Sequence, residues 1–447
     1  MTASDPTHGS SGWHVHEAST ASALVEHFFR HSYGRLVAVL SREVGVRHVE
    51  DVEDAVQTAL LSGLTSWVAN GVPEDPAAWL YRVALNHLMG TLRKDAGRLR
   101  ILEAAADESS AAVDHPRSQR SPAEVDEELL RMLFVCCDEA IPRDSRLVLA
   151  LKTLCGFSTT EIALRLFISE ANVLKRLGRA REHLRRVPPA LHPVPLDALR
   201  SRLESVHVVL YLLFNEGYLT SHSDRVIRRE LCDEAIRLAT LLTTHPVGAA
   251  AASYALLALM HFHRARLSTR LDATGALLLL AEQDRTCWDQ NHIGLGAEWL
   301  QKSAGGETFT RFHAEAGIAA EHAFASSFEQ TRWNEIVDLY DLLERLAPSP
   351  LNGMNRAVAV AEWKGPEAGL AAMRGLVPPR WTNGYYLWDA VLGDLHRRAG
   401  HHEEARPFME RALATAPSEA ERALLRRRLA SLPRSTTERP SLPSRST

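Results

Sequence analysis

The chain has 447 residues, of which 45% are hydrophobic and 24% are charged, and its formal net charge is −4. This length predicts two to four domains, each large enough to bury a core. Alanine and leucine dominate over β-branched residues, which predicts an almost all-α protein, and the charge excludes a uniformly basic nucleic-acid-binding protein.

Cysteine usage and hydropathy exclude further classes. The cysteines form no C-x-x-C pair and are odd in number, so they indicate neither a disulfide framework nor a cysteine zinc site. We expect them to be buried apolar residues in a reducing cytosol: Cys136, Cys137, Cys155, Cys232 and Cys287. No apolar run approaches the roughly 20 residues that span a bilayer, and no signal peptide is visible. These patterns predict a cytoplasmic protein with no membrane partner and no cofactor.

The N-terminal part predicts a disordered tail over residues 1–20 and a helical domain over 21–95. Apolar residues at helical spacing form three groups: Leu24, Phe28, Leu36 and Leu40; Val52, Val56, Leu60, Leu64 and Trp67; and Trp79, Val83 and Met89. The third helix is expected to begin after the Pro-Glu-Asp-Pro segment at 73–76.

Residues 96–122 are polar and predict a linker, after which residues 123–187 form a second helical domain. Within it, GFSTTEIALRLFISEANVLKRLGRAREHLRR (156–186) has the pattern of a helix-turn-helix. Ser158 and Glu161 form a capping box at the start of the first helix, and Ser169 is the predicted N-cap of the second.

The second helix of this motif is expected to bury Val173 and Leu177 and to expose a basic face. Its basic residues are Lys175, Arg176, Arg179, Arg181, Arg185 and Arg186, with Asn172 near the start. A basic helix held across a short turn suits the major groove of DNA. An ordinary solvated pair of amphipathic helices is the alternative.

Beyond a proline-rich connection at 188–197, residues 198–430 predict a long series of helices, followed by a solvated tail over 431–447. Residues 389–417 have the register of a tetratricopeptide repeat, with small or packing residues at Leu392, Gly393, Gly400, Ala405, Ala412 and Pro417. A helical bundle without a true repeat remains the alternative.

Two segments upstream of the helix-turn-helix carry a resemblance to a known family. DVEDAVQTALLSGLTSW (51–67) and PAAWLYRVALNHLMGTLRK (76–94) resemble region 2 of extracytoplasmic-function sigma factors, members of the sigma-70 family. The helix-turn-helix at 156–186 resembles their region 4. Pieces of the C-terminal half, among them LYLLFNEGY (210–218), resemble a subgroup with a long helical extension.

The resemblance implies two small helical sigma domains joined by a flexible linker, followed by a tetratricopeptide-like regulatory domain. It implies core RNA polymerase and promoter DNA as partners, the DNA as a −35 duplex and an opened −10 element. It also implies a non-enzymatic role in promoter-specific initiation, with the extension free to contact the sigma domains.

Site residues follow from the same resemblance. Those implied for polymerase binding are Asp54, Gln57, Leu60, Leu61 and Leu64. Those implied for the −10 element are Arg82, Asn86, Arg93 and Lys94, and those for the −35 element are Ser169, Asn172, Lys175, Arg176 and Arg179.

The chain departs from the family pattern at two places. The family commonly has Arg immediately before the Asn at position 86 and Asp four residues after it, whereas this chain has Leu85 and Gly90. Gly90 also weakens a helix by roughly 1 kcal/mol relative to Ala. In the recognition helix, Lys175 stands one position later than the usual basic residue, so the −35 sequence cannot be copied from relatives.

Other candidates are weaker. His261 and His263 do not share a helix face, which argues against a metal site. Asn215, Glu216 and Gly217 are predicted to cap a helix, with Gly217 left-handed, and a ligand pocket is the alternative. Two other functions stay open: a duplex-DNA-binding regulator that never joins polymerase, and a helical-repeat scaffold with a degenerate sigma module.

Overall fold

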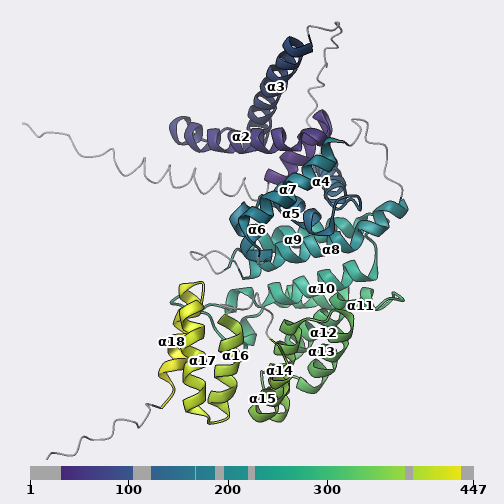
Figure 1. The fold of residues 1–447 in the computed structure, drawn as a ribbon. Helices are drawn as coiled ribbons and strands as arrows, with labels where there is room; N and C mark the ends of the chain where they lie inside the picture. The colour runs from purple at the N-terminus through teal and green to yellow at the C-terminus, as the bar shows by residue number, and fades with distance from the viewer. Residues whose placement is uncertain are drawn as a thin grey trace, which may run out of the picture. The chain divides into compact units, whose positions relative to one another are not determined.

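A computed structural model describes residues 32–103, 122–166, 168–186, 196–219, 227–377 and 386–433. These residues are almost entirely helical and contain no strand, only an isolated bridge between Leu271 and Leu277, so the all-α prediction is confirmed (Figure 1). The predicted tail at 1–20, most of the linker and most of the proline-rich connection lie outside the described residues. The chain divides into two compact units between Leu213 and Phe214.

The first unit begins with a helix over residues 32–44, the 3-10 turn η1 (Val46–His48), α2 (Val49–Asn70) and α3 (Pro76–Glu103). The α2 helix buries Val52, Val56, Leu60 and Trp67, as predicted. In Figure 1, α3 packs across α2 and continues beyond it, past the predicted end at residue 95.

The residues of α3 that are buried lie on a different side of the helix from the predicted core residues. The fully buried side chains are Leu80, Ala84 and Leu88. Trp79 lies at the edge, with its ring 5.5 Å from that of Trp67, and Val83 and Met89 are only partly buried. The helix has a wide apolar face, and packing against α2 selects the side of it that carries the small Ala84, because a small residue allows close helix approach.

The helix-turn-helix lies in the same unit, after α4 (Pro122–Cys136) and α5 (Arg143–Thr153). Its helices are α6 (Thr159–Leu166) and α7 (Glu170–Arg185). Both predicted caps are present. Glu161 N donates to Ser158 Oγ at 3.1 Å while Ser158 N donates to Glu161 Oε2 at 2.6 Å, and Asn172 N donates to Ser169 Oγ. Val173 and Leu177 are buried, as expected.

The second unit is built of helices that mostly pack on their neighbours in chain order (Figure 1), except that the twelfth helix packs more on the tenth than on the eleventh. After α8 (Leu196–Tyr218), in which the boundary between the units falls, come α9 (Arg229–Thr244), α10 (Ala251–Ala265), three 3-10 turns, η2 (Leu267–Thr269), η3 (Leu280–Glu282) and η4 (Arg285–Cys287), and α11 (Gln290–Ser303). They are followed by α12 (Arg311–Phe324), α13 (Trp333–Leu346), α14 (Pro350–Lys364), α15 (Pro366–Arg374), α16 (Tyr386–Arg398), α17 (His402–Thr415) and α18 (Glu419–Ala430).

Small residues let α16 and α17 approach closely. A Cβ built on Gly393 would lie 2.7 Å from Met409 Cγ, and Ala405 and Ala412 are fully buried. Gly400 turns the chain between the two helices with φ +81°. These residues therefore let α16 and α17 pack closely as one helix pair.

The prediction for Gly217 is wrong. Its φ is not positive, and it lies inside α8, where a Cβ would come within 2.6 Å of Cys232 N and 2.8 Å of Arg228 O. Glycine is needed here because the start of α9 crosses α8 at backbone contact, with Arg228 N donating to Gly217 O at 2.8 Å. Local sequence shows that a glycine is present, but not which segment crosses it.

Other findings concern cysteines, histidines and membrane spans. Cys136, Cys137 and Cys232 are buried as expected, but Cys155 is only partly buried and Cys287 is exposed, so the expectation is wrong for these two. His261 faces His292, with 2.8 Å between their Nδ1 atoms, and no cluster of three or more metal-ligating side chains occurs in the described ranges. Among the helices described, none combines the length and apolarity needed to cross a membrane.

Candidate nucleic-acid interface

The exposed face of α7 is formed by Asn172, Lys175 and Arg179, which lie within one stripe because they are three and four residues apart. Neither Lys175 nor Arg179 forms an ion pair with any described residue. Glu170, the acidic residue at the start of α7, accepts from Thr159 Oγ1 at 3.3 Å and Thr160 Oγ1 at 3.0 Å. The stripe is therefore an exposed surface of two cations and one amide, whose side-chain N–H groups can donate hydrogen bonds to a ligand.

Arg176 and Ser169 were also predicted to contact the −35 element, but both form contacts within the protein. The Arg176 guanidinium pairs with Asp144 of α5 at 3.1 Å, and its side chain is only 21% exposed, so the expectation of a free, exposed Arg176 is wrong. Ser169 is exposed, but its hydroxyl accepts the Asn172 amide as the N-cap. Both residues hold the helix in place in this structure.

The C-terminal half of α7 is engaged with α2 through ion pairs. Arg181 donates to Glu50 at 2.9 Å and also pairs with Glu53, and Arg185 donates to Glu50 at 2.8 Å. Glu53 is 1% exposed and also accepts from Thr153 Oγ1 of α5 at 2.5 Å. Burial and the neighbouring Glu53 raise the pKa of the Tyr33 phenol, which keeps that group neutral.

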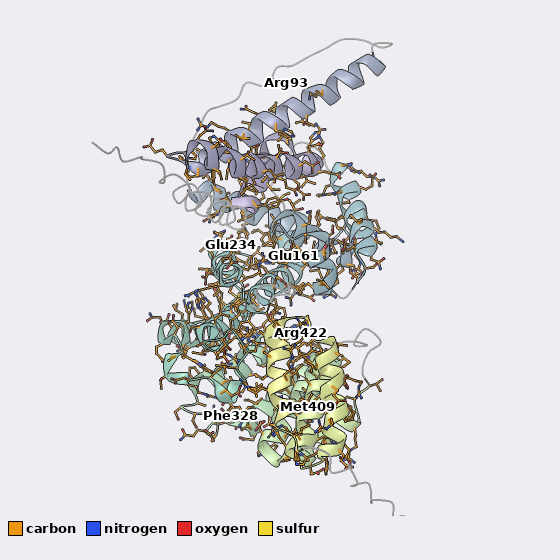
Figure 2. The ribbon with its side chains drawn as sticks, turned by 90° about the vertical axis from the view of Figure 1, so that its left-hand side faces the viewer. Arg93, Glu161, Glu234, Phe328, Met409 and Arg422 are labelled. Atoms are coloured by element: carbon orange, nitrogen blue, oxygen red, sulfur yellow. The ribbon has the colours of Figure 1, made fainter. Side chains whose placement is uncertain are left out.

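A second stripe runs along α3. Arg82, Asn86 and Arg93 are exposed and share one face because they are four and seven residues apart, and Lys94 is exposed beside them. Figure 2 shows Arg93 on the part of α3 that continues past the packed core. None of the three basic side chains forms an ion pair within the described residues. Gly90 has open space around its Cβ position, so nothing packs on it.

The predicted polymerase-binding strip on α2 divides between surface and core. Asp54 and Leu61 are exposed, with Leu61 63% exposed, while Gln57 and Leu64 are partly buried. Leu60 is 3% exposed and belongs to the core, so the prediction that it is part of an accessible binding surface is wrong. The remaining strip is an apolar surface with a carboxylate at one end.

Comparison with known proteins identifies the helix-turn-helix segment. Residues 131–184 match sigma-70 region 4, and residues 202–304 match a family of unknown function, DUF6596. A protein of Rhizobium meliloti (strain 1021), described as uncharacterised, is 35% identical over 388 residues, which cover 86% of this chain and 90% of the relative. The chain belongs to that protein's family. No solved structure matches it.

A region 4 segment is typical of proteins that act in transcription initiation, and in that family it implies binding to core RNA polymerase and −35 promoter DNA. The first turns of α8 dock on this domain. Arg202 pairs with Asp138 at 2.6 Å and donates to Phe134 O at 3.2 Å, and Arg143 pairs with Glu204 at 2.9 Å. The Arg202 side chain is only 11% exposed, so its pair with Asp138 is well shielded from water.

The ion pairs between α2 and region 4 were not predicted from the sequence. Glu53 and Arg181 are 128 residues apart, and each belongs to a charged segment that is equally compatible with a solvated surface. One local signal was present: Glu53 stands between Val52 and Val56 on the apolar side of α2, where an isolated carboxylate requires a partner.

Proposed function

We propose that this protein is an alternative sigma factor that binds core RNA polymerase and directs promoter-specific initiation. The observation that carries the proposal is the region 4 helix-turn-helix, which is capped at both helix starts. Its exposed stripe holds Asn172 beside Lys175 and Arg179, neither of which forms an ion pair with a described residue. Asn172, near the start of α7, is suited to bidentate recognition of a base edge. Lys175 and Arg179 are suited to phosphate or guanine contacts along the groove.

Residues 32–94 supply the region 2 function in this proposal. The stripe of Arg82, Asn86 and Arg93 contacts the opened −10 element, since cations neutralise phosphates and the amide pairs with an unstacked base. Asp54 and Leu61 contact core polymerase from α2. This assignment is supported by the exposure of these side chains and by the order of the two segments along the chain.

Engaging a whole promoter requires the ion pairs between α2 and α7 to open. The −10 and −35 elements lie about 25 base pairs apart, on the order of 80 Å along B-DNA. The described structure joins the two regions directly through Glu50 and Glu53, with Arg181 and Arg185 on the other side. We propose that polymerase binding separates the regions and releases these two arginines toward the DNA backbone.

The C-terminal helices act on the sigma domains in this proposal. Support comes from Arg202, which anchors the start of α8 on region 4 through Asp138 and the Phe134 carbonyl. An extension anchored in this way stays at a high effective concentration near the sigma domains, so weak contacts become populated. Its tetratricopeptide-like character is supported by the packing of Gly393 on α17.

Size-exclusion chromatography with core polymerase tests the proposal against its rivals. Co-elution of the full-length protein with the enzyme is expected, together with binding of promoter DNA by the complex. A protein that binds duplex DNA but never co-elutes is a plain regulator. A protein that does neither, while its folded helices are intact, is a scaffold with a degenerate sigma module.

A further inference from the structure

Three arginines in the second unit come together around two aromatic rings, and none of them forms an ion pair with a residue that the structure describes. We call Arg266, Arg270 and Arg285 the arginine cluster. They come from the end of α10, from the residue after η2 and from η4. The aromatic residues are Tyr218, at the end of α8, and Trp288, directly after η4.

The guanidinium groups lie against the two rings. Arg270 Cζ is 3.8 Å from the centroid of the Tyr218 ring, and Arg285 Cζ is 5.1 Å from that of Trp288. Arg266 reaches both rings, at 6.0 Å from Tyr218 and 5.9 Å from Trp288. Arg270 is 8% exposed and Trp288 is 3% exposed, whereas Arg266 and Arg285 are only partly buried, so the cluster lies partly withdrawn from solvent.

None of the three guanidinium groups forms an ion pair within the part of the chain that the structure describes, and the carboxylate of Glu329 acts on Arg285 only from a longer distance. Arg270 donates to the Tyr218 carbonyl, and Arg285 donates to the carbonyls of His322 and Ala325, both at 2.8 Å, and to Thr331 Oγ1 at 3.1 Å. Arg266 donates to no described residue. By contrast Arg264, two residues earlier on α10, is paired with Asp233 at 2.6 Å.

The surroundings add further hydrogen-bonding groups without a partner. The buried atoms that make no hydrogen bond are Arg266 Nε, Trp288 Nε1, His322 Nδ1 and the Tyr218 hydroxyl oxygen. Two of these, Arg266 Nε and Trp288 Nε1, can only donate, and the Tyr218 hydroxyl can donate as well. The site therefore has more donors than acceptors, as well as more positive than negative charge.

The neighbouring histidines are neutral and do not add to the charge. Burial, assisted by the nearby Arg266, lowers the pKa of His263 and of His322 to about 3. Burial also lowers the pKa of Arg266, and the charge of Arg270 acts in the same direction. Cations held in a partly buried site without a paired carboxylate are unfavourable, and an anion bound there would relieve this cost.

We propose that the arginine cluster binds a small phosphate-bearing anion that carries at least two negative charges. The Arg266 guanidinium lies against both rings and donates to no described residue, so its N–H groups are available to the oxygens of a phosphate group. The burial of Trp288 and Arg270 excludes the backbone of a nucleic-acid duplex. All members of the cluster and both rings lie within residues 202–304, so the site assigns a ligand class to the segment of unknown function.

Pyrophosphate is the probe, titrated into the full-length protein by calorimetry at constant ionic strength set with chloride. We expect saturable binding and a higher melting temperature with pyrophosphate. Arg266→Gln should weaken binding at least tenfold, because one of three cationic contacts is lost. Without pyrophosphate the same variant should melt at a higher temperature than the wild type, because an uncompensated cation has been removed.

Arg332→Gln is the matched control, since Arg332 is exposed in the same unit and pairs with Glu321. Its pyrophosphate affinity should equal that of the wild type. Absence of pyrophosphate binding by the wild type overturns the proposal, as does unchanged binding by Arg266→Gln. An Arg266→Gln protein that melts at a lower temperature without the probe would show that Arg266 serves packing on the two rings, which also overturns it. These readouts are independent of promoter or polymerase binding.

Discussion

The guanidinium of Arg181, on the recognition helix, pairs with the carboxylate of Glu53, on the buried side of α2. The contact joins two segments that lie 128 residues apart in the chain. Glu53 is 1% exposed, whereas the neighbouring Glu50, which also binds Arg181, has a side chain that is 45% exposed. The two carboxylates therefore differ in burial while sharing a partner.

Glu53→Gln should destabilise the contact far more than Glu50→Gln. Removing one partner of a buried pair costs about 3–5 kcal/mol, whereas an exposed pair contributes about 0–1 kcal/mol. Hydrogen–deuterium exchange of α2 and α7 measures the difference. We expect exchange in these helices to become at least about a hundredfold faster with Glu53→Gln and to stay within about fivefold with Glu50→Gln, given about 1.4 kcal/mol per factor of ten. Equal effects from the two variants would contradict the account.

Lys175→Ala and Arg179→Ala should weaken binding to a −35 duplex without changing the fold, because both side chains are exposed and form no ion pair with a described residue. The expected loss is about 1–3 kcal/mol for a base-specific contact, and a phosphate contact should instead lower the salt slope by about 1. Fluorescence anisotropy over a salt series distinguishes the two. Arg176→Ala should also lower the melting temperature, since Arg176 pairs with Asp144. If only Arg176→Ala impairs DNA binding, the assignment of the stripe is wrong.

Asp54→Lys and Leu61→Arg should abolish co-elution with core polymerase and leave the circular dichroism spectrum unchanged, since both side chains are exposed. Leu60→Arg is not a usable test, because Leu60 is in the core and the variant would unfold. Leu174→Arg is the matched control, as Leu174 is 59% exposed but lies on region 4. Normal co-elution of the folded Asp54→Lys protein would show that α2 is not part of the polymerase-binding surface.

Local features of the sequence were predicted well, and long-range ones were not. The caps at Ser158 and Ser169 depend on residues within three positions, so their chemistry is visible in the sequence. The sequence did not show which face of α3 is buried. Trp79 and Leu80 each begin a set of apolar residues at helical spacing, and only the contact with α2 selects the set that contains Leu80.

Gly217 and the arginine cluster illustrate the same limit. The contact that requires glycine at position 217 comes from Arg228 and Cys232, at the start of α9. The arginine cluster likewise assembles from the end of α10, the residue after η2 and η4, and it surrounds a ring from α8; these segments share no sequence pattern. Neither Arg266 nor Trp288 has a neighbour in the sequence that indicates the other.

Gly90→Ala should stabilise α3 by up to about 1 kcal/mol, because Ala is the better helix former. The Cβ position is open and Gly90 does not have a positive φ, so the methyl group causes no clash. Slower hydrogen exchange in residues 80–94 would show the effect. Faster exchange there would mean that Gly90 is required by a conformation other than this helix.

Lowering the pH from 7.5 to 5 should destabilise the second unit through its buried histidines. In the unfolded chain histidine has a pKa near 6.5, whereas His263 has a pKa of about 3 in the fold. The unfolded state therefore binds more protons between these values, and stability is complete above 6.5 and is lost as the pH falls toward 3. At pH 5 the loss is on the order of 2 kcal/mol for such a group.

His263→Phe should remove this part of the pH dependence and keep an aromatic contact with Tyr218. In the native protein the ring centroids of His263 and Tyr218 are 5.0 Å apart. Melting temperatures at pH 7.5 and pH 5 provide the measurement. The difference between the two pH values should be smaller in the variant than in the wild type. An unchanged difference would mean that His263 is protonated in the folded protein or does not contribute.

Run-off transcription with purified core polymerase, the full-length protein and sheared genomic DNA tests the central claim most directly. The account predicts defined start sites that appear only with the protein present, and that weaken when Lys175 and Arg179 are both replaced by Ala while co-elution with polymerase persists. Absence of any protein-dependent transcript, from a folded protein that is saturating over the enzyme, would contradict the assignment as a sigma factor.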